Sequence, residues 1–440
     1  MSDFVKDVRI VTEFLLQAED HLLSSAAPPL QPHTSLELIM DKPVIRIERD
    51  HADIGRTNVD RYRPTAAHSS NPCQSFRGSE VPAPESSTIF RFGLAANISL
   101  SLVAIGMLSL AMARTADAAQ PALADTSTAG SGARSAGTSS TPTQLVDALN
   151  LVFGKQTDNR AVHAKGIVLH GRFLPSSAAA DLSQAPHFQK NAVPLTVRFS
   201  DFAGIPTIPD NNGLANPRGL ALKFQLPDGT DTDLVTHSFN GFPSPTADDF
   251  REFLIALGTS GAGVTHPTPA ETYLAAHPVA KAFLETQKPP PVSYGTLSYY
   301  GVNTFKFTNA RGVSRYGRYR IIPQAGEQLL TEEQAKQAPP GYLADEIRRR
   351  AAGAPVRFHM LVQLAVDGDR LDDPSVAWPE TRATIDVGVI EITSVAADSD
   401  VEQRALMFLP TSLPVGIEAA DPMIAARSAS YPVSYGRRHQ

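Results

Sequence analysis

From residue 160 onward, the chain contains short runs of β-branched and aromatic residues separated by turn residues. Runs of this kind predict β-strands. The segment Leu226-Pro-Asp-Gly-Thr-Asp231 has the composition of a turn and separates two of the runs. We place eight strands, at residues 162–174, 195–202, 219–226, 234–239, 299–309, 313–322, 356–366 and 384–394.

Between the strands, two segments have a helical period instead. Residues 247–257 carry Phe250, Phe253, Leu254 and Leu257 at helical spacing, and Thr246 is a suitable N-cap. Residues 269–287 predict a second helix, and residues 143–153 predict a short helix before the first strand. The order of strands, helices and strands lacks regular β-α alternation. It predicts α+β architecture, an antiparallel β body with attached helices, in one domain over 143–440.

The N-terminal part has a different texture. Residues 1–88 predict a poorly ordered extension, apart from an amphipathic helix at 4–23. Residues 94–113 carry no charge and are long enough to cross a bilayer. We therefore expect residues 89–118 to be a signal peptide, cleaved near Ala116-Asp-Ala118, or a transmembrane anchor. Arg91 and Arg114 flank the apolar run on both sides, so charge does not decide between the two.

A buried core helix is the third interpretation of residues 94–113. The low-complexity segment 119–142, which predicts a flexible linker, follows directly and disfavours it. Both remaining interpretations place residues 143–440 in the periplasm or elsewhere outside the cytoplasm, with a possible membrane anchor through 94–113.

Composition narrows the function classes. The net charge of −6 without a basic block gives no indication of a nucleic-acid partner. The single cysteine, Cys73, excludes an intramolecular disulfide framework and a cysteine-rich metal site. Thirty-five prolines favour a loop-rich β architecture over a helical bundle.

Candidate chemistry is concentrated near the C-terminus. Arg427, Tyr431 and Arg438 have the spacing i, i+4 and i+11, which on a helix places them within about 40° of one another. Nearby cations stabilise a phenolate, and a phenolate is a ligand for ferric iron. The alternative is an amphipathic helix with a buried tyrosine and solvated arginines. Pro432 predicts a kink in either case.

Two further segments carry polar residues that suggest a site. Arg198 and Ser200 alternate on the strand at 195–202 and share a face, which is costly to bury unless it meets an anion. His163 lies in an apolar segment, where a histidine is more often structural than catalytic.

Six segments resemble, in order, those of the haem catalase family and in particular its short, catalase-related peroxidases. They are Arg160-Ala-Val-His-Ala-Lys-Gly166, Val197-Arg-Phe-Ser200 with Ala203-Gly204, Asn216-Pro-Arg-Gly-Leu-Ala-Leu-Lys-Phe224, Tyr300-Gly-Val-Asn-Thr-Phe-Lys306, Leu413-Pro-Val-Gly-Ile-Glu418, and Arg427 with Tyr431-Pro432. The resemblance covers about residues 142–440. It implies an antiparallel β-barrel with flanking helices that binds haem b through its iron.

The resemblance also implies roles for individual residues. His163 would be the acid–base residue on the peroxide side, and Ser200 would hydrogen-bond its ring. Tyr431 would be the iron ligand, with Arg427 favouring its phenolate form. The resemblance further implies that Arg160, Arg198 and Arg438 pair with the haem propionates, while Val162, Phe242 and Phe250 lie against the haem or the peroxide pocket.

The chain departs from the catalase pattern in two ways. His237, in Asp233-Leu-Val-Thr-His-Ser238, falls where catalases carry an asparagine, and we include it among the catalytic candidates. The chain also ends at Gln440, without the C-terminal helical region of full catalases. We expect the haem channel to be shorter and more open as a result, which would admit larger peroxides.

These departures favour a haem-dependent peroxidase that reduces organic hydroperoxides, and hydrogen peroxide slowly, with a small electron donor. We expect a monomer or a small homo-oligomer. The first alternative is a small true catalase. The alternative from another class is a secreted β-barrel that holds haem or a lipid without turnover, for which an acid–base residue such as His163 has no purpose.

Overall fold

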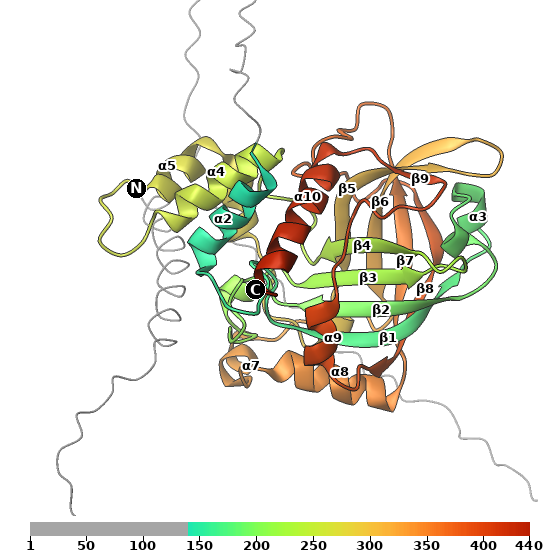
Figure 1. The fold of residues 1–440 in the computed structure, drawn as a ribbon, viewed down its shortest axis with the longest axis horizontal. Coiled ribbons are helices and arrows are strands. Elements are labelled where there is room, and N and C mark those ends of the chain that lie inside the picture. The colour runs from blue at the N-terminus through green and yellow to red at the C-terminus, as the bar shows by residue number, and fades with distance from the viewer. Residues whose placement is uncertain (1–139) are drawn as a thin grey trace, which may run out of the picture. The chain divides into compact units, whose positions relative to one another are not determined.

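The computed structural model describes residues 140–440, in which eight antiparallel strands form a closed barrel (Figure 1). The neighbours around the barrel are β4-β3-β2-β1-β8-β7-β6-β5, and the pair His237 and Tyr300 closes it between β4 and β5. A ninth, short strand pairs with β5 at Phe305 to Phe307, beyond the point where β4 meets it. The strands are β1 (Gly166–Pro175), β2 (Val193–Ser200), β3 (Gly219–Gln225), β4 (Asp231–His237), β5 (Tyr299–Thr308), β6 (Ser314–Pro323), β7 (Val356–Leu364), β8 (Thr384–Val395) and β9 (Ile417–Ala419).

The predicted antiparallel barrel with flanking helices is confirmed, and all eight predicted strands are present. The first strand was placed wrongly at its start, because β1 begins at Gly166 and not at residue 162. Residues 160–165 form a loop, in which His163 has a left-handed φ of 57°. A strand needs an extended backbone, so this residue cannot belong to one.

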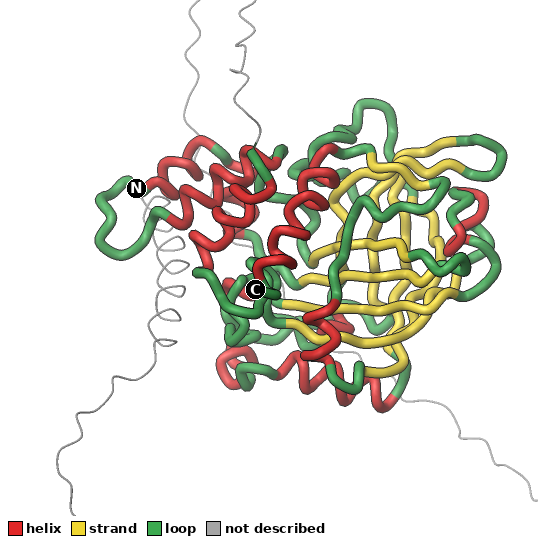
Figure 2. Tube along the Cα trace, in the orientation of Figure 1, coloured by secondary structure: helices red, strands yellow, loops and turns green. Residues whose placement is uncertain are grey.

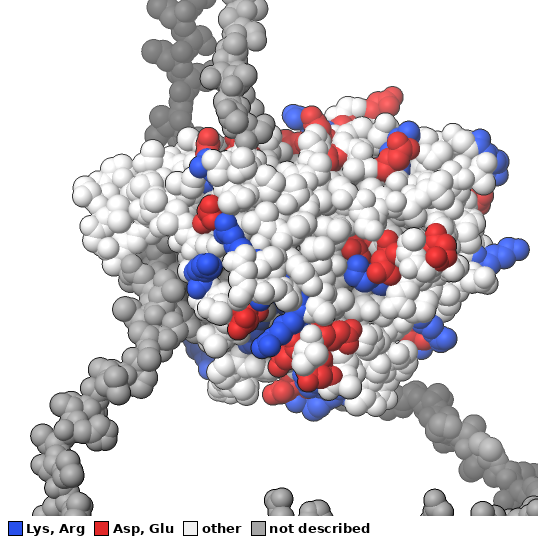
Figure 3. Space-filling view, in the orientation of Figure 1, with Lys and Arg blue, Asp and Glu red and all other residues white. Residues whose placement is uncertain are grey.

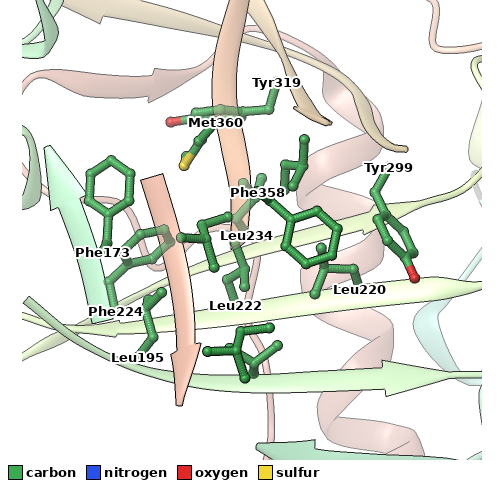
Figure 4. Close-up of a cluster of buried hydrophobic side chains, with 14 of the residues drawn as sticks. Phe173, Leu195, Leu220, Leu222, Phe224, Leu234, Tyr299, Tyr319, Phe358 and Met360 are labelled. Carbon is green, nitrogen blue, oxygen red and sulfur yellow. The ribbon is translucent and has the colours of Figure 1, made fainter. Parts of the chain in front are cut away.

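Large apolar side chains fill the barrel interior (Figure 4). Phe173, Leu222, Phe358 and Met360 come from three different strands, β1, β3 and β7, and are all fully buried. Alternation along each strand places every second side chain inside the barrel. The interior is therefore a packed core, and the space for a ligand lies outside it.

Helices cover one side and one end of the barrel (Figure 2). The side group contains α2 (Pro142–Phe153), α4 (Ala247–Gly258), α5 (Pro269–Ala276), α6 (Pro278–Glu285) and α10 (Pro422–Arg437). Capping fixes where several of them start: Thr141 with Gln144 caps α2, and Thr246 caps α4 as predicted. Helix α2 packs against both α4 and α10. The C-terminal helix α10 therefore lies between the barrel and the other helices of this group (Figure 1).

The prediction of a single helix at residues 269–287 is wrong, because the structure has two helices there, α5 and α6. The break falls at His277, whose backbone angles (φ −125°, ψ 77°) are not helical. Pro278 follows it, and proline both lacks an N–H group and disfavours the helical region for the residue before it.

Four further helices are present that the hydrophobic pattern did not indicate: α3 (Ala179–Leu182), α7 (Glu332–Gln337), α8 (Tyr342–Gly353) and α9 (Ser399–Ala405). Helix α8 buries Leu343, Ile347 and Ala351 along one face, and its other positions are mostly charged.

The expected helix at 4–23, the extension 1–88 and the apolar segment 94–113 all lie outside the described residues. Within residues 140–440, no helix combines the length and hydropathy that a bilayer span requires. On the face of the molecule in Figure 3, charges of both signs are interspersed among larger uncharged areas.

Candidate active site

His163 lies in the loop between α2 and β1, and its backbone is held on both sides. Its N–H donates to the carbonyl of Phe202 at 2.7 Å, and its own carbonyl accepts from the guanidinium of Arg198 at 2.9 Å. A non-glycine residue in the left-handed region costs free energy and persists only where its surroundings fix it. These bonds therefore fix the direction in which the imidazole points.

The imidazole of His163 contacts Ser200 at the end of β2. Their Nδ1 and Oγ atoms are 3.1 Å apart, which leaves Nε2 as the ring nitrogen available to a ligand. Gly219, at the start of β3, makes this contact possible. A Cβ atom there would lie 2.5 Å from Ser200 Oγ and 2.9 Å from His163 Nδ1.

His237 ends β4 and lines the same cavity as His163. The backbone N–H of Phe239 points at its Nδ1, at 3.4 Å, so Nδ1 is the acceptor and Nε2 carries the proton. Nε2 is buried and has no hydrogen-bond partner among residues 140–440. The second imidazole is therefore an unused hydrogen-bond donor beside the first.

Both imidazoles are neutral at physiological pH. Burial, followed by the positive charge of Arg198, lowers the pKa of His163 to about 3. Burial and then the charge of Arg427 lower the pKa of His237 to about 3. A general base must be unprotonated before it acts, and His163 meets that condition.

Tyr431 and Arg427 are one turn apart on α10, as their spacing predicts. The guanidinium of Arg427 donates twice to the phenolic oxygen of Tyr431, from Nε at 3.1 Å and from Nη2 at 2.8 Å. Its remaining nitrogen donates to Asn303 Oδ1 at 2.5 Å, and Asn303 in turn donates to Asp421 at 2.7 Å. Asp421 also caps α10, so this chain of bonds fixes both the helix and the arginine.

Pro432 lies inside α10, and the helix continues through it to Arg437. Arg438 is the C-cap residue, not part of the helix, and within the described residues its side chain hydrogen-bonds to backbone carbonyls and not to Tyr431. Its guanidinium donates to the carbonyl of Leu406 at 2.6 Å. The predicted alignment of both arginines on one phenol therefore holds for Arg427 alone.

Arg438 belongs to a group of three arginines with Arg160 and Arg198. Arg160 donates to the carbonyls of Gln403 and Leu406, and Arg198 donates to the side-chain oxygen of Gln403 at 3.1 Å. Among the described residues, none of the three forms an ion pair with a carboxylate. Burial and then the mutual repulsion of these arginines lower the pKa of Arg160, and burial lowers the pKa of Arg438. Three clustered guanidiniums without a carboxylate partner in residues 140–440 have the chemistry to bind a carboxylate.

Two adjoining cavities bring every predicted site residue together. The arginine cavity is lined by the three arginines and Ser200, and the histidine cavity by His237, Phe242, Phe250 and Arg427. Val162, His163 and Tyr431 line both. The rings of Phe242 and Phe250 are 4.8 Å apart, and the ring of Phe242 is 6.4 Å from that of His237. Residues as far apart in the chain as Arg160 and Arg438 thus surround one continuous space.

Several supporting residues were not predicted. Gln403 holds two of the arginines, and Asn303 and Asp421 hold Arg427. Asn303 stands inside a segment that the resemblance already covers, and Asp421 precedes a proline in the manner of an N-cap, so both had a signal in the sequence. Gln403 had none, because it lies on α9, which the pattern does not predict.

Comparison with known proteins identifies relatives of this arrangement. A family model described as catalase matches residues 115–439. The chain is 35% identical over 298 residues to a catalase-related peroxidase of Mycolicibacterium paratuberculosis, a match that covers 67% of this chain and 93% of that protein. It is 32% identical over 308 residues to a catalase-related peroxidase of Synechococcus elongatus, covering 69% and 90%. A crystal structure of a fungal catalase aligns with a TM-score of 0.58 at 21% identity, over 67% of this chain and 62% of that one.

Proposed function

The chain belongs to the catalase family and is an oxidoreductase that acts on peroxide, and we propose that it is a haem peroxidase that reduces organic hydroperoxides with a small one-electron donor. The observation that carries the proposal is the pairing across one space of a neutral, oriented His163 with a Tyr431 oxygen that accepts two bonds from Arg427. Catalase-family proteins bind haem, and the cofactor proposed here is haem b.

The residues present fit this cofactor. The arginine cavity supplies three guanidiniums, those of the buried Arg198 and Arg438 and the half-buried Arg160. They have no carboxylate partner in the described part of the chain, which suits the two propionates. Tyr431 would supply an oxygen ligand, and the two hydrogen bonds from Arg427 hold that oxygen in place. Val162 and Leu149 line both cavities and supply apolar surface for a flat ring system.

When bound, haem would supply the redox centre that takes up the two oxidising equivalents of the hydroperoxide. Nε2 of His163 takes the proton from the terminal oxygen of the hydroperoxide and gives it to the oxygen that leaves as an alcohol. Ser200 holds Nδ1 throughout, so the ring does not rotate between the two transfers. With D as the donor, the overall reaction is ROOH + 2 DH → ROH + H₂O + 2 D•.

His237 takes a separate part in the proposed reaction. Its Nε2–H is fixed as a donor by the Phe239 bond to Nδ1, and it is placed to donate to a peroxide oxygen in the histidine cavity. An asparagine amide would donate in the same way from a smaller group. We assign His237 to positioning the peroxide and His163 to moving the proton.

The first test compares spectra and turnover of the haem-supplemented protein. We expect a Soret band for the wild type and an altered ferric spectrum for Tyr431→Phe, which removes the oxygen ligand. We expect His163→Ala to keep the haem and to lose most hydroperoxide cleavage, by about 10²–10⁴-fold. His170→Ala is the matched control, since His170 lies on β1 away from the cavities and pairs with Glu402.

Each alternative predicts a different result. Absence of a Soret band would remove the haem assignment. Haem binding with unchanged peroxide cleavage in His163→Ala would support a carrier without turnover. Vigorous oxygen release from hydrogen peroxide without a donor would identify a small true catalase. Oxidation of the donor by an organic hydroperoxide, with little oxygen release, is the outcome expected of the peroxidase.

Location outside the cytoplasm is part of the same proposal, and N-terminal sequencing of the mature protein tests whether residues 89–118 are removed.

A further inference from the structure

A third cavity, the apolar chamber, adjoins the histidine cavity. Its volume is about 420 Å³, within the range of about 300–1,000 Å³ that small-molecule sites occupy. Helices α2, α4 and α6 and the segment 211–213 surround it. Its apolar side chains include Val152, Phe253, Leu254, Leu257 and Leu284.

Four phenylalanines line both the apolar chamber and the histidine cavity: Phe202, Phe242, Phe250 and Phe283. The ring of Phe202 packs edge-on against His163, with centroids 5.5 Å apart. The two cavities therefore meet along these four rings, one of which contacts the candidate catalytic imidazole. A ligand that reaches His163 from this side has to pass along these rings.

Polar side chains that line the chamber already have hydrogen-bond or ion-pair partners in the protein. The amide of Asn211 donates to the carbonyl of Ala335, and that of Gln287 donates to the carbonyl of Phe283. Lys288 forms an ion pair with Glu327 at 2.7 Å. The free surface of the chamber is thus mainly apolar, which suits a hydrocarbon better than a sugar, a nucleotide or a peptide.

We propose that the apolar chamber holds the alkyl tail of a medium- or long-chain organic hydroperoxide while the hydroperoxide group lies in the histidine cavity. The inference rests on the proposed peroxidase function and names the substrate class of the same site. Continuity with the histidine cavity through the four phenylalanines selects this occupant, because a tail in the chamber places the reacting end at His163. Each methylene buried in the chamber increases kcat/KM by up to about fourfold until the chamber is full.

The test is a series of n-alkyl hydroperoxides from ethyl to dodecyl, assayed with the haem-loaded protein. Leu284→Trp adds volume on the chamber wall, at a half-buried position that lines neither of the other cavities. Val279→Trp is the matched control, because Val279 lies on the same helix, α6, and is 45% exposed. The ratio of kcat/KM for decyl over ethyl hydroperoxide is the readout. Binding of 1-decanol, measured by calorimetry, provides a second readout that needs no turnover.

We expect a ratio well above tenfold in the wild type and in Val279→Trp, and a ratio at least tenfold lower in Leu284→Trp. Weaker 1-decanol binding in Leu284→Trp than in Val279→Trp is expected in parallel. A flat series in an active wild-type enzyme would overturn the inference and leave the peroxidase function intact. An equal change in both tryptophan variants would also overturn it. Failure of the proposed function has a different signature, namely the absence of turnover with every hydroperoxide.

Discussion

The pH dependence of peroxide cleavage is the sharpest consequence of the histidine geometry. His163 acts as a base only when it is neutral, and burial together with Arg198 lowers its pKa to about 3. An ordinary histidine has a pKa of about 6.5 and is about 97% protonated at pH 5. A base of that kind would lose about thirtyfold in rate between pH 8 and pH 5. With a pKa of about 3, His163 is about 1% protonated at pH 5, so the rate should be unchanged there.

The sign follows from the direction of the shift. A lowered histidine pKa moves the loss of the neutral base to more acid solution, so cleavage declines only as the pH falls toward 3. His237 shares the same cavity, and its pKa is also about 3, so it adds no second transition between pH 5 and pH 8.

Stopped-flow mixing of the haem-loaded protein with hydroperoxide measures the second-order rate constant of the first step, without a donor that titrates. The ferric spectrum recorded at each pH before mixing verifies that the haem stays bound. A constant rate from pH 8 to pH 5 is expected. A thirtyfold fall with a midpoint near pH 6.5 would show that His163 is solvated like a surface histidine, and the assigned geometry would then be wrong.

Three further predictions concern buried polar groups, two near the site and one in the barrel core. His237→Leu should slow cleavage by roughly tenfold to a hundredfold, whereas His237→Asn, which keeps a donor, should lose less; kcat/KM with hydroperoxide decides this. Arg218→Leu should reduce the free energy of unfolding by about 3–5 kcal/mol, because it removes the buried guanidinium that pairs with Asp201 and leaves this buried carboxylate only the more distant cation of Lys165, at 3.8 Å. Urea denaturation against the exposed control Arg370→Leu measures the loss. His187 is buried among aromatic rings, and burial lowers its pKa to about 3. On acidification the unfolded chain takes up the proton first, so stability falls below pH 6.5. His187→Leu should therefore lose about 2 kcal/mol less stability than the wild type between pH 8 and pH 5, and parallel denaturation curves would refute this.

The strands were predictable from their runs of β-branched and aromatic residues, and the order of the elements predicted an antiparallel β body. Closure of that body into a barrel was implied by the family resemblance alone. Helix α8 was not predicted, because only Leu343, Ile347 and Ala351 form its apolar face and most of its other positions are charged. The break at His277 could have been predicted from Pro278, which follows it. We missed it because the residues on both sides have a helical period.

For the site, residue identities were predictable and conformations were not. The segment around His163 identified the residue, while its left-handed backbone depends on bonds to Phe202 and Arg198, which are far away in the sequence. In the same way, the spacing on α10 placed Arg427 beside Tyr431 correctly. It could not show that Arg438 turns instead to the carbonyl of Leu406, a tertiary contact.

The strand ends that carry the site also carry a buried ion pair. Ser200 ends β2 and Gly219 begins β3, and both adjoin His163. Asp201 directly follows the serine and Arg218 directly precedes the glycine. Both charged side chains are fully buried and form an ion pair with each other.

The backbone of Arg218 extends this connection to the third strand end. Its N–H donates to Ser238 Oγ at 2.9 Å, and its carbonyl accepts from the N–H of Ser238 at 2.8 Å. Ser238 directly follows His237, so the Arg218–Asp201 pair holds together the ends of β2, β3 and β4. Removing one partner leaves a buried charge and loosens all three ends. The loss of stability in Arg218→Leu should therefore be accompanied by displacement of both imidazoles, and peroxide cleavage should fall even at temperatures where the variant remains folded.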